Sequence, residues 1–179
     1  MKFWFTADYH LGHSKIIEYC NRPFKNVNEM NYEIIKRHNE IIEEKDIVFH
    51  IGDFCFKNTG SPKVLEYEKL LNGKLIFIRG NHDCNNSCKT ILESAIIKYG
   101  GYEMNLVHNP GDYNPNYLIN LVGHVHNRWK IQQMKTSVLL NVGVDIWNYY
   151  PISIKTINKV IANPIKNIKN YKTSREKEN

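Results

Sequence analysis

Residues 3–10 read Phe-Trp-Phe-Thr-Ala-Asp-Tyr-His, an apolar strand that runs directly into a turn and a polar cluster. The arrangement recurs where residues 47–53 read Ile-Val-Phe-His-Ile-Gly-Asp and residues 75–83 read Leu-Ile-Phe-Ile-Arg-Gly-Asn-His-Asp. Buried parallel strands have this apolar character, and open α/β folds build their sites at the carboxyl ends of such strands. We therefore expect the polar side chains that follow these strands to converge: Asp8, His10, Asp53, Asn81 and His82.

Length and composition predict a single domain with a real core. The chain has 179 residues, 42% of them hydrophobic, and no apolar run long enough to span a bilayer. Residues 1–6 are too short and too soon polar for a signal peptide, so a cytoplasmic location is expected. The cysteines show no regular disulfide framework; we interpret them as reduced thiols, or as a structural zinc site in the case of Cys84 and Cys88.

The formal net charge of +6 is unevenly distributed. Five basic and two acidic residues follow Pro164, so half of the excess positive charge lies in this last segment. We expect a core domain over residues 1–162 and a basic, flexible tail over residues 163–179. The alternative interpretation of the tail is an arm that contacts nucleic-acid phosphates.

Periodicity and turn residues indicate alternating helices and strands in the first half and mainly strands in the second. Helices are expected over residues 14–20, 28–44 with Asn28 as N-cap, 61–71 and 87–98. Further strands are expected over residues 102–107, 117–122, 137–142 and 152–154. This pattern predicts mixed sheets with helices packed outside them.

Five short motifs carry the functional signal: Asp8-x-His10, Gly52-Asp53, Gly80-Asn81-His82-Asp83, His108 and Gly123-His124-Val125-His126. In order and rough spacing they resemble the motif set of the calcineurin-like metallophosphoesterases, over residues 2–157. Residues 8–13, 22–24 and 144–147 look more narrowly like the small single-domain members from bacteria, archaea and phages. The resemblance implies an α/β fold, a four-layer α/β/β/α sandwich of two mixed sheets flanked by helices.

The resemblance also implies a site for two divalent cations. Asp53 would bridge them, with Asp8, His10 and His126 completing the first metal's ligands and Asn81, His108 and His124 the second's. Carboxylate, amide and imidazole ligands leave Mn²⁺, Fe²⁺, Co²⁺, Ni²⁺ and Zn²⁺ open. A hydroxide bridging the metals would attack phosphorus. His82 would protonate the leaving group, with Asp83 orienting its ring; the alternative is that His82 only binds backbone in its turn.

Other polar residues are open to two interpretations each. Arg22, His13 and Arg128 are candidate substrate contacts, the last beside Trp129, whose ring either stacks a base or simply packs. His13 and His50 could equally be packed histidines. Asp145 either pairs with a basic neighbour or caps a turn.

The sequence thus predicts a metal-dependent phosphoesterase acting on phosphomonoesters or phosphodiesters. The first alternative is a nuclease or cyclic-nucleotide phosphodiesterase, and the second is a phosphate-binding module without catalysis. All expected ligand positions and the proton donor are present, which favours an enzyme. The substrate, whether nucleotide, nucleic acid or another phosphate ester, and the oligomeric state are not specified by the sequence.

Overall fold

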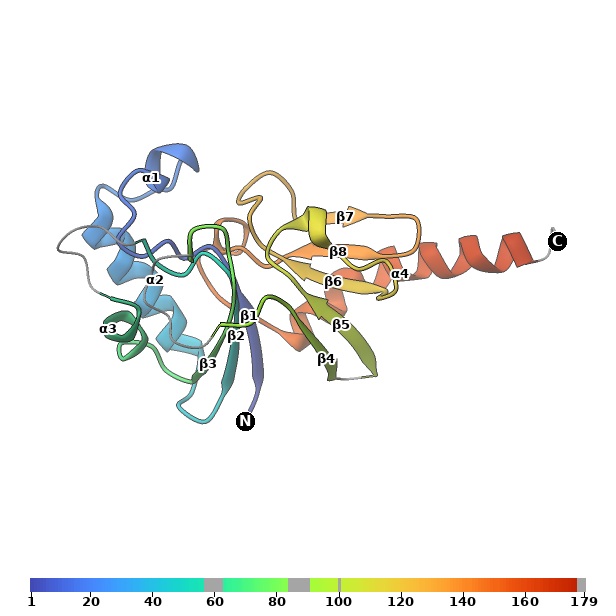
Figure 1. Cartoon of the computed structure of the whole chain (residues 1–179), viewed down its shortest axis with the longest axis horizontal. Coiled ribbons are helices and arrows are strands. Elements are labelled where there is room, and N and C mark those ends of the chain that lie inside the picture. Colours follow the sequence, from blue (N-terminus) through green and yellow to red (C-terminus); the bar gives the residue numbers. More distant parts are fainter. Residues whose placement is uncertain (57–62, 84–90, 100, 177–179) are drawn as a thin grey trace.

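Two β-sheets, seen from the side in Figure 1, form the body of the molecule. The computed structural model describes residues 1–56, 63–83, 91–99 and 101–176. The strands are β1 (Phe3–Thr6), β2 (Ile47–Ile51), β3 (Lys74–Ile78), β4 (Ala95–Tyr99), β5 (Tyr102–Leu106), β6 (Ile119–Val122), β7 (Ile131–Gln133), β8 (Val138–Asn141) and β9 (Ile152–Ser153). The helices are α1 (Ile16–Tyr19), α2 (Val27–Ile41), α3 (Val64–Glu68) and α4 (Ile154–Glu176), with 3₁₀ turns η2 (Pro110–Asp112) and η3 (Val144–Ile146).

Both sheets are mixed, as expected. The first has the order β3-β2-β1-β9, with β1, β2 and β3 parallel and β9 antiparallel to β1. The second has the order β4-β5-β6-β8-β7, parallel through β5, β6 and β8 and antiparallel at both edges. The parallel register brings the ends of β1, β2 and β3 to one edge of the first sheet, where the three predicted polar clusters follow.

The main core lies between the two sheets. Phe5, Phe49 and Ile78 of the first sheet share one buried cluster with Met104 and Leu121 of the second. Helices α2 and α3 cover the other face of the first sheet, where Met30, Ile34, Val64 and Phe77 form a second cluster. Helix α4 packs along β8, β9 and β1. The prediction of two mixed sheets with flanking helices is confirmed.

The first three predicted helices differ in their bounds, and α1 is shorter than the predicted 14–20. The N-cap of helix α2 lies two residues earlier than expected, because the side-chain oxygen of Asn26, not Asn28, accepts the N–H groups of Asn28 and Glu29, each at 3.0 Å. Helix α3 is shorter than the predicted 61–71, and residues 61 and 62 lie outside the described residues.

The prediction of a helix over residues 87–98 is wrong in the part that the structure describes. Residues 95–99 form β4, which pairs antiparallel with β5 from Ala95 opposite Leu106 to Tyr99 opposite Tyr102. Gly101, directly before β5, has φ +82°, a conformation that favours glycine. The sequence pair Gly100-Gly101 is a hairpin signal that the helix prediction did not take into account.

The segment expected to be a flexible tail is helical through Glu176. Helix α4 passes through Pro164 without ending, and Ile165 and Ile168 belong to the main core beside Ile161. These side chains anchor the helix beyond the boundary expected at residue 162, so the separate role of residues 163–179 remains a prediction. Cys84 and Cys88, the proposed zinc ligands, lie outside the described residues.

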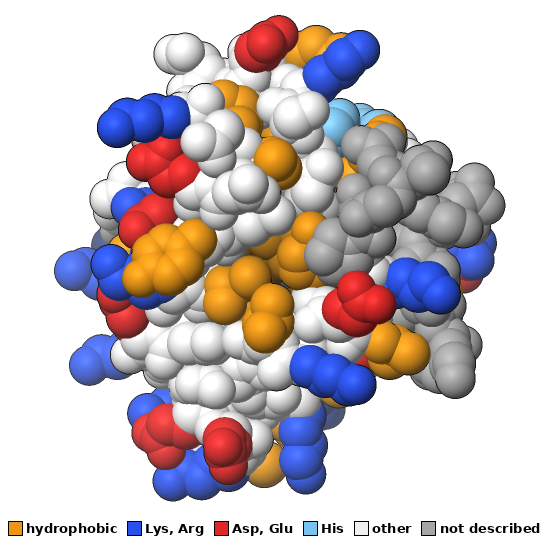
Figure 2. All heavy atoms as spheres, turned by 90° about the vertical axis from the view of Figure 1, so that its left-hand side faces the viewer, with side chains coloured by type: hydrophobic (Ala, Val, Ile, Leu, Met, Phe, Trp, Pro, Cys, Tyr) orange, Lys and Arg blue, Asp and Glu red, His pale blue; other side chains and the backbone are white. Residues whose placement is uncertain are grey.

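Charged side chains of both signs are interspersed over the helical end of the molecule, which faces the viewer in Figure 2. The net charge of +6 is therefore not gathered into one patch on this face. Among the described residues, no helix is both long enough and apolar enough to cross a membrane.

Candidate metal centre

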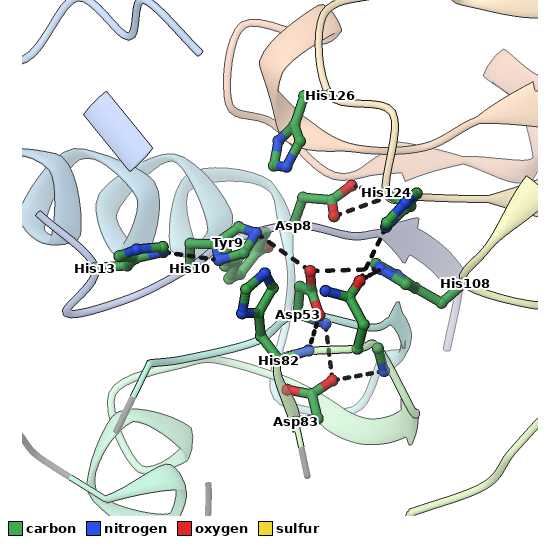
Figure 3. A network of polar contacts seen from close by, with 12 residues as sticks. Asp8, Tyr9, His10, His13, Asp53, His82, Asp83, His108, His124 and His126 are labelled. Atoms are coloured by element: carbon green, nitrogen blue, oxygen red, sulfur yellow. Dashed lines mark hydrogen bonds and ion pairs between the residues drawn. The ribbon is translucent and has the colours of Figure 1, made fainter. Parts of the chain in front are cut away.

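Five of the predicted metal ligands have left-handed backbone conformations. The φ angles are +60° at Asp8, +50° at His10, +57° at Asp53, +69° at His124 and +48° at His126. Such angles are uncommon outside glycine and persist only where surrounding structure enforces them. The strain is thus concentrated in the turns that follow the strands, where it turns these side chains toward one another (Figure 3).

The carboxylate of Asp53 lies at the centre of the cluster. Its Oδ2 is 3.4 Å from Nε2 of His10 and 3.4 Å from Nε2 of His108. Its Oδ1 accepts the backbone N–H of His82 at 2.9 Å. A Cβ atom at Gly80 would overlap this carboxylate, so only glycine leaves it room. One carboxylate oxygen therefore faces two imidazole nitrogens that come from different strands.

The histidine rings are oriented by bonds at their other nitrogen. His108 donates from Nδ1 to the carbonyl oxygen of Ile51 at 2.8 Å, which leaves Nε2 facing Asp53. Nδ1 of His10 is 3.3 Å from Nδ1 of His13. Metal-binding histidines are held by such bonds to their second nitrogen.

A first group of possible metal ligands consists of Asp8, His10 and His126, whose ligand atoms lie within 4.8 Å of one another. Asp8 is fully buried, and both of its oxygens accept the backbone N–H of His124, at 3.1 and 3.0 Å. Nδ1 of His126 donates to Oδ2 of Asp145 at 2.9 Å. This carboxylate fixes the ring so that Nε2 is left as the donor atom.

A second group consists of Asp53, His108 and His124, again within 4.8 Å. Oδ1 of Asn81 joins it, 2.9 Å from Nδ1 of His124 and 3.2 Å from Nε2 of His108. The structure therefore brings all seven predicted ligands together in two groups that lie side by side around Asp53.

The charges of this cluster compensate one another. Burial raises the pKa of Asp8 to about 6, against the opposing effect of His108 and His126. Burial also disfavours ionised Asp53, but His10 and His108 outweigh it and hold its pKa well below the usual range. For His108 and His126, burial is outweighed by Asp53 and Asp145 respectively, and their pKa values rise to about 9 and about 10. The carboxylates of this cluster therefore favour positive charge on the His108 and His126 side of the site.

The residues fit a bound cation. Nε2 of His10 is buried and has no hydrogen-bond partner among the described residues. A buried imidazole nitrogen without a partner is costly unless another ligand satisfies it. Burial lowers the pKa of His10 to about 4, so the ring is neutral at pH 7 and its lone pair is available. Each group therefore offers oxygen and nitrogen donors of the kind that divalent metals bind.

Arg22, a predicted substrate contact, lies in the interior instead. Its side chain is fully buried and binds Asp145 through two hydrogen bonds, at 2.8 and 2.9 Å. It also donates to the backbone carbonyls of Asp8 at 2.7 Å and Tyr9 at 3.0 Å. Arg22 therefore supports the turn at residues 8–10 and is not placed to contact a substrate.

Asp83 does not orient the His82 ring as expected. Its carboxylate accepts the backbone N–H groups of Asp53 at 2.7 Å, Gly80 at 2.8 Å and Phe54 at 3.1 Å. It thereby joins the turns after β2 and β3. The exposed His82 ring points away from Asp83 and lies 5.2 Å from the His10 ring, centroid to centroid (Figure 3).

The remaining candidates divide between packing and the surface. His50 is buried between the rings of Tyr9 and Phe54, with centroid distances of 4.6 and 5.0 Å, so it is a packed histidine. His13 stacks on Phe56 and lines the same groove as Arg128. Trp129 packs against the small cluster of Val107, Val122 and Leu139.

Sequence reasoning left the role of Asp145 open, and the structure assigns it a partner on each side, Arg22 and His126. It did not foresee the close approach of Gly80 to Asp53. The motif Gly-Asn-His-Asp contained that signal, since a glycine directly before a ligand often marks a close backbone approach.

Comparison with known proteins agrees with this geometry. A family model described as calcineurin-like phosphoesterase matches residues 1–176. An uncharacterized protein of Methanocaldococcus jannaschii is 38% identical over 170 residues, which cover 89% of this chain and 91% of the relative. The Gene 66 protein of Mycobacterium phage L5 is 31% identical over 81 residues, 45% of this chain and 39% of the relative. A solved structure of a protein of unknown function from Aquifex aeolicus has the same fold, with a TM-score of 0.69, 23% identity, and coverage of 89% of this chain and 99% of that one.

Proposed function

Because this chain belongs to the calcineurin-like phosphoesterase family, we propose that it is a dinuclear metal-dependent hydrolase of phosphomonoesters or phosphodiesters. One observation carries the proposal. Two imidazole nitrogens from separate strands lie 3.4 Å from the same oxygen of Asp53, and that of His10 has no hydrogen-bond partner among the described residues. A carboxylate that would be shared by two cations, with His10 and His108 as ligands on either side, accounts for this arrangement.

In this proposal Asp8, His10 and His126 hold one cation, Asn81, His108 and His124 hold the other, and Asp53 is shared. When bound, the two cations supply positive charge that attracts a phosphate group and lowers the pKa of a coordinated water. The bonds from Asp145, Ile51 and His13 to the second ring nitrogens keep three of the four ligating histidines, His126, His108 and His10, in place.

His82 is the proposed proton donor to the leaving oxygen. Its ring is exposed at the edge of the cluster, and its backbone N–H is fixed on Asp53 at 2.9 Å. The contacts of Asp83 hold the turn that carries His82 and leave the ring itself unconstrained by that carboxylate. An accessible imidazole can take its proton from solvent and pass it to an ester oxygen.

The test is turnover of 4-nitrophenyl phosphate and of bis(4-nitrophenyl) phosphate by the purified protein, with and without added Mn²⁺. The proposal expects metal-dependent release of nitrophenol from at least one of them. Asp8→Asn serves as the matched inactive control, because it keeps the shape of the side chain and removes its charge. Release that is equal in the two proteins, or absent with every divalent metal in the series Mn²⁺ to Zn²⁺, contradicts the proposal.

A non-catalytic phosphate-binding module is the second candidate. It would bind phosphate and metal without turnover, so the same assay separates it from the enzyme. A nuclease or cyclic-nucleotide phosphodiesterase is a narrower form of the proposal, and a panel of cyclic nucleotides and oligonucleotides distinguishes these substrates.

A further inference from the structure

Two grooves share His124 as a lining residue. We call one the Tyr19 groove, lined by Tyr19, Arg128, His13 and His82 together with Ile16 and Val125. The other, the Asn109 groove, is lined by Asn109, Asp112, Glu93, Arg79 and Asn81. Each has a volume of about 250 Å³, so size does not distinguish them and their chemistry must.

We infer that the Tyr19 groove receives the leaving group of the substrate, and that this leaving group is a nucleotide: an aromatic base and sugar that carry a further phosphate. The inference rests on the proposed function, because it assigns a substrate class to the same site.

The position of His82 decides which groove holds the leaving group. A proton donor must reach the oxygen that departs from phosphorus, and His82 lines the Tyr19 groove. In the hydrolysis, the oxygen of water bonds to phosphorus and the bond from phosphorus to the sugar oxygen breaks. Its electron pair stays on that oxygen, which takes a proton from His82, and His82 regains a proton released by the water.

The lining of the Tyr19 groove fits a flat, anionic group. Tyr19 is 69% exposed, a high value for a ring that borders a site, and offers a stacking surface at the rim. The guanidinium of Arg128 offers the planar, charged donors that bind phosphate. Among the described residues, no Asp or Glu side chain lines this groove, so nothing there repels an anion.

The Asn109 groove has the opposite character. Glu93 and Asp112 both line it, and its one arginine, Arg79, already forms an ion pair with Glu93 at 2.6 Å. Two carboxylates disfavour a second phosphate on this side. This difference in charge between the two grooves orients the bound substrate so that its additional phosphate lies near Arg128.

The experiment compares three thymidine dinucleotides: d(TpT), d(pTpT) and d(TpTp). Their products are identified by mass spectrometry, so that the broken bond and the leaving nucleoside are known. We expect the isomer with its phosphate on the leaving nucleoside to be hydrolysed with a kcat/KM roughly tenfold or more above that of d(TpT), as a hydrogen bond to a charged group provides. Arg128→Ala should abolish this preference, whereas Arg79→Ala, the matched control, should retain it.

Tyr19→Ala should lower kcat/KM for all three dinucleotides by about 5- to 100-fold, while Tyr19→Phe, which keeps the ring, should not. The inference is overturned if Arg79→Ala loses the phosphate preference and Arg128→Ala keeps it, or if neither arginine affects it. If the wild type hydrolyses no ester at all, the proposed function fails. The nucleotide preference of the Tyr19 groove is then tested by measuring the binding of thymidine 3′,5′-bisphosphate to the protein without added metal. Arg128→Ala must weaken this binding, and Arg79→Ala must not.

Discussion

Arg22 and Asp145, 123 positions apart in the sequence, form a buried ion pair with two hydrogen bonds of 2.8 and 2.9 Å. Asp145 also accepts from His126, and Arg22 also donates to the carbonyl oxygens of Asp8 and Tyr9. The pair thereby connects the turn after β1 to His126, which follows β6 of the other sheet. A change in either residue should therefore alter the positions of the candidate metal ligands Asp8 and His126.

Asp145→Asn should weaken metal binding by about 10- to 100-fold, as changes in groups that orient ligating histidines commonly do. The physical reason is that the amide cannot hold the His126 ring and Arg22 with a full negative charge. Metal titration by calorimetry measures the effect. Asp46→Asn is the matched control, because Asp46 is also a buried aspartate but binds the backbone of Lys2 and the indole of Trp4. Equal metal affinity in the two variants would contradict the assignment.

Asp53→Asn should weaken the binding of both cations together, because the negative charge that the substitution removes would be shared between them. Metal content per protein is measured after dialysis. His124→Asn is the comparison, expected to affect mainly the cation near Asn81. Two tightly held ions in Asp53→Asn would exclude the shared position.

His82→Ala should keep both metals and slow hydrolysis of esters with poor leaving groups by about 10²- to 10⁴-fold, the usual range for general acid catalysis. The loss should be smaller for nitrophenyl esters, since nitrophenolate departs without a proton. The kcat of an alkyl and a nitrophenyl ester is compared at verified metal content. Equal slowing of the two esters would argue against proton donation by His82.

Two truncations of helix α4 should distinguish its contribution to the stability of the fold from that of its basic residues to nucleic-acid binding. Removal of all residues after Ala162 deletes the buried Ile165 and Ile168, and each such loss typically costs about 2–5 kcal/mol of unfolding free energy. A chain ending at Ile168 keeps both and removes most of the basic residues. If the tail is a nucleic-acid arm, this second truncation should weaken oligonucleotide binding and flatten its dependence on salt. An unchanged salt slope would leave a solubilising helix as its role.

The free energy of unfolding should decrease as the pH is lowered from 6.5 to 4, partly because of His38. Its Nε2 donates to the carbonyl of Asn72 and its Nδ1 accepts the Tyr9 hydroxyl, both at 2.8 Å. Burial lowers its pKa from 6.5 to about 4, despite the bond to Asn72. Between these two pH values the unfolded chain binds a proton at His38 and the folded chain does not, which favours unfolding. The contribution of neutral His38 to the free energy of unfolding is therefore fully present above pH 6.5 and is lost toward pH 4, by up to about 3 kcal/mol.

His38→Gln removes this titration and should flatten the stability profile over that window. Urea unfolding of the variant and the wild type at pH 7, 5.5 and 4.5 gives the difference, in which contributions from other groups cancel. A difference that does not change with pH would show that His38 does not titrate there.

The sequence by itself determined the parallel strands, the convergence of their polar ends and the family. Each ligand motif follows an apolar strand such as residues 47–51, and parallel pairing necessarily brings the carboxyl ends of neighbouring strands together. The motif residues are local in the sequence, so their identity and order could be recognised without knowledge of the contacts.

Only the tertiary structure decided the partners of Arg22, Asp83 and Asp145. The bond from Arg22 to Asp145 spans 123 positions and that from Asp53 to Asp83 spans 30, and no local pattern encodes which distant group lies within reach. The same reason explains β4, where pairing with β5 overrides helical spacing, and Ile165 and Ile168, whose burial depends on the sheets beside α4. Long-range packing, which a sequence pattern does not contain, determines which polar side chains are buried as supports of the candidate metal centre and which remain exposed beside it.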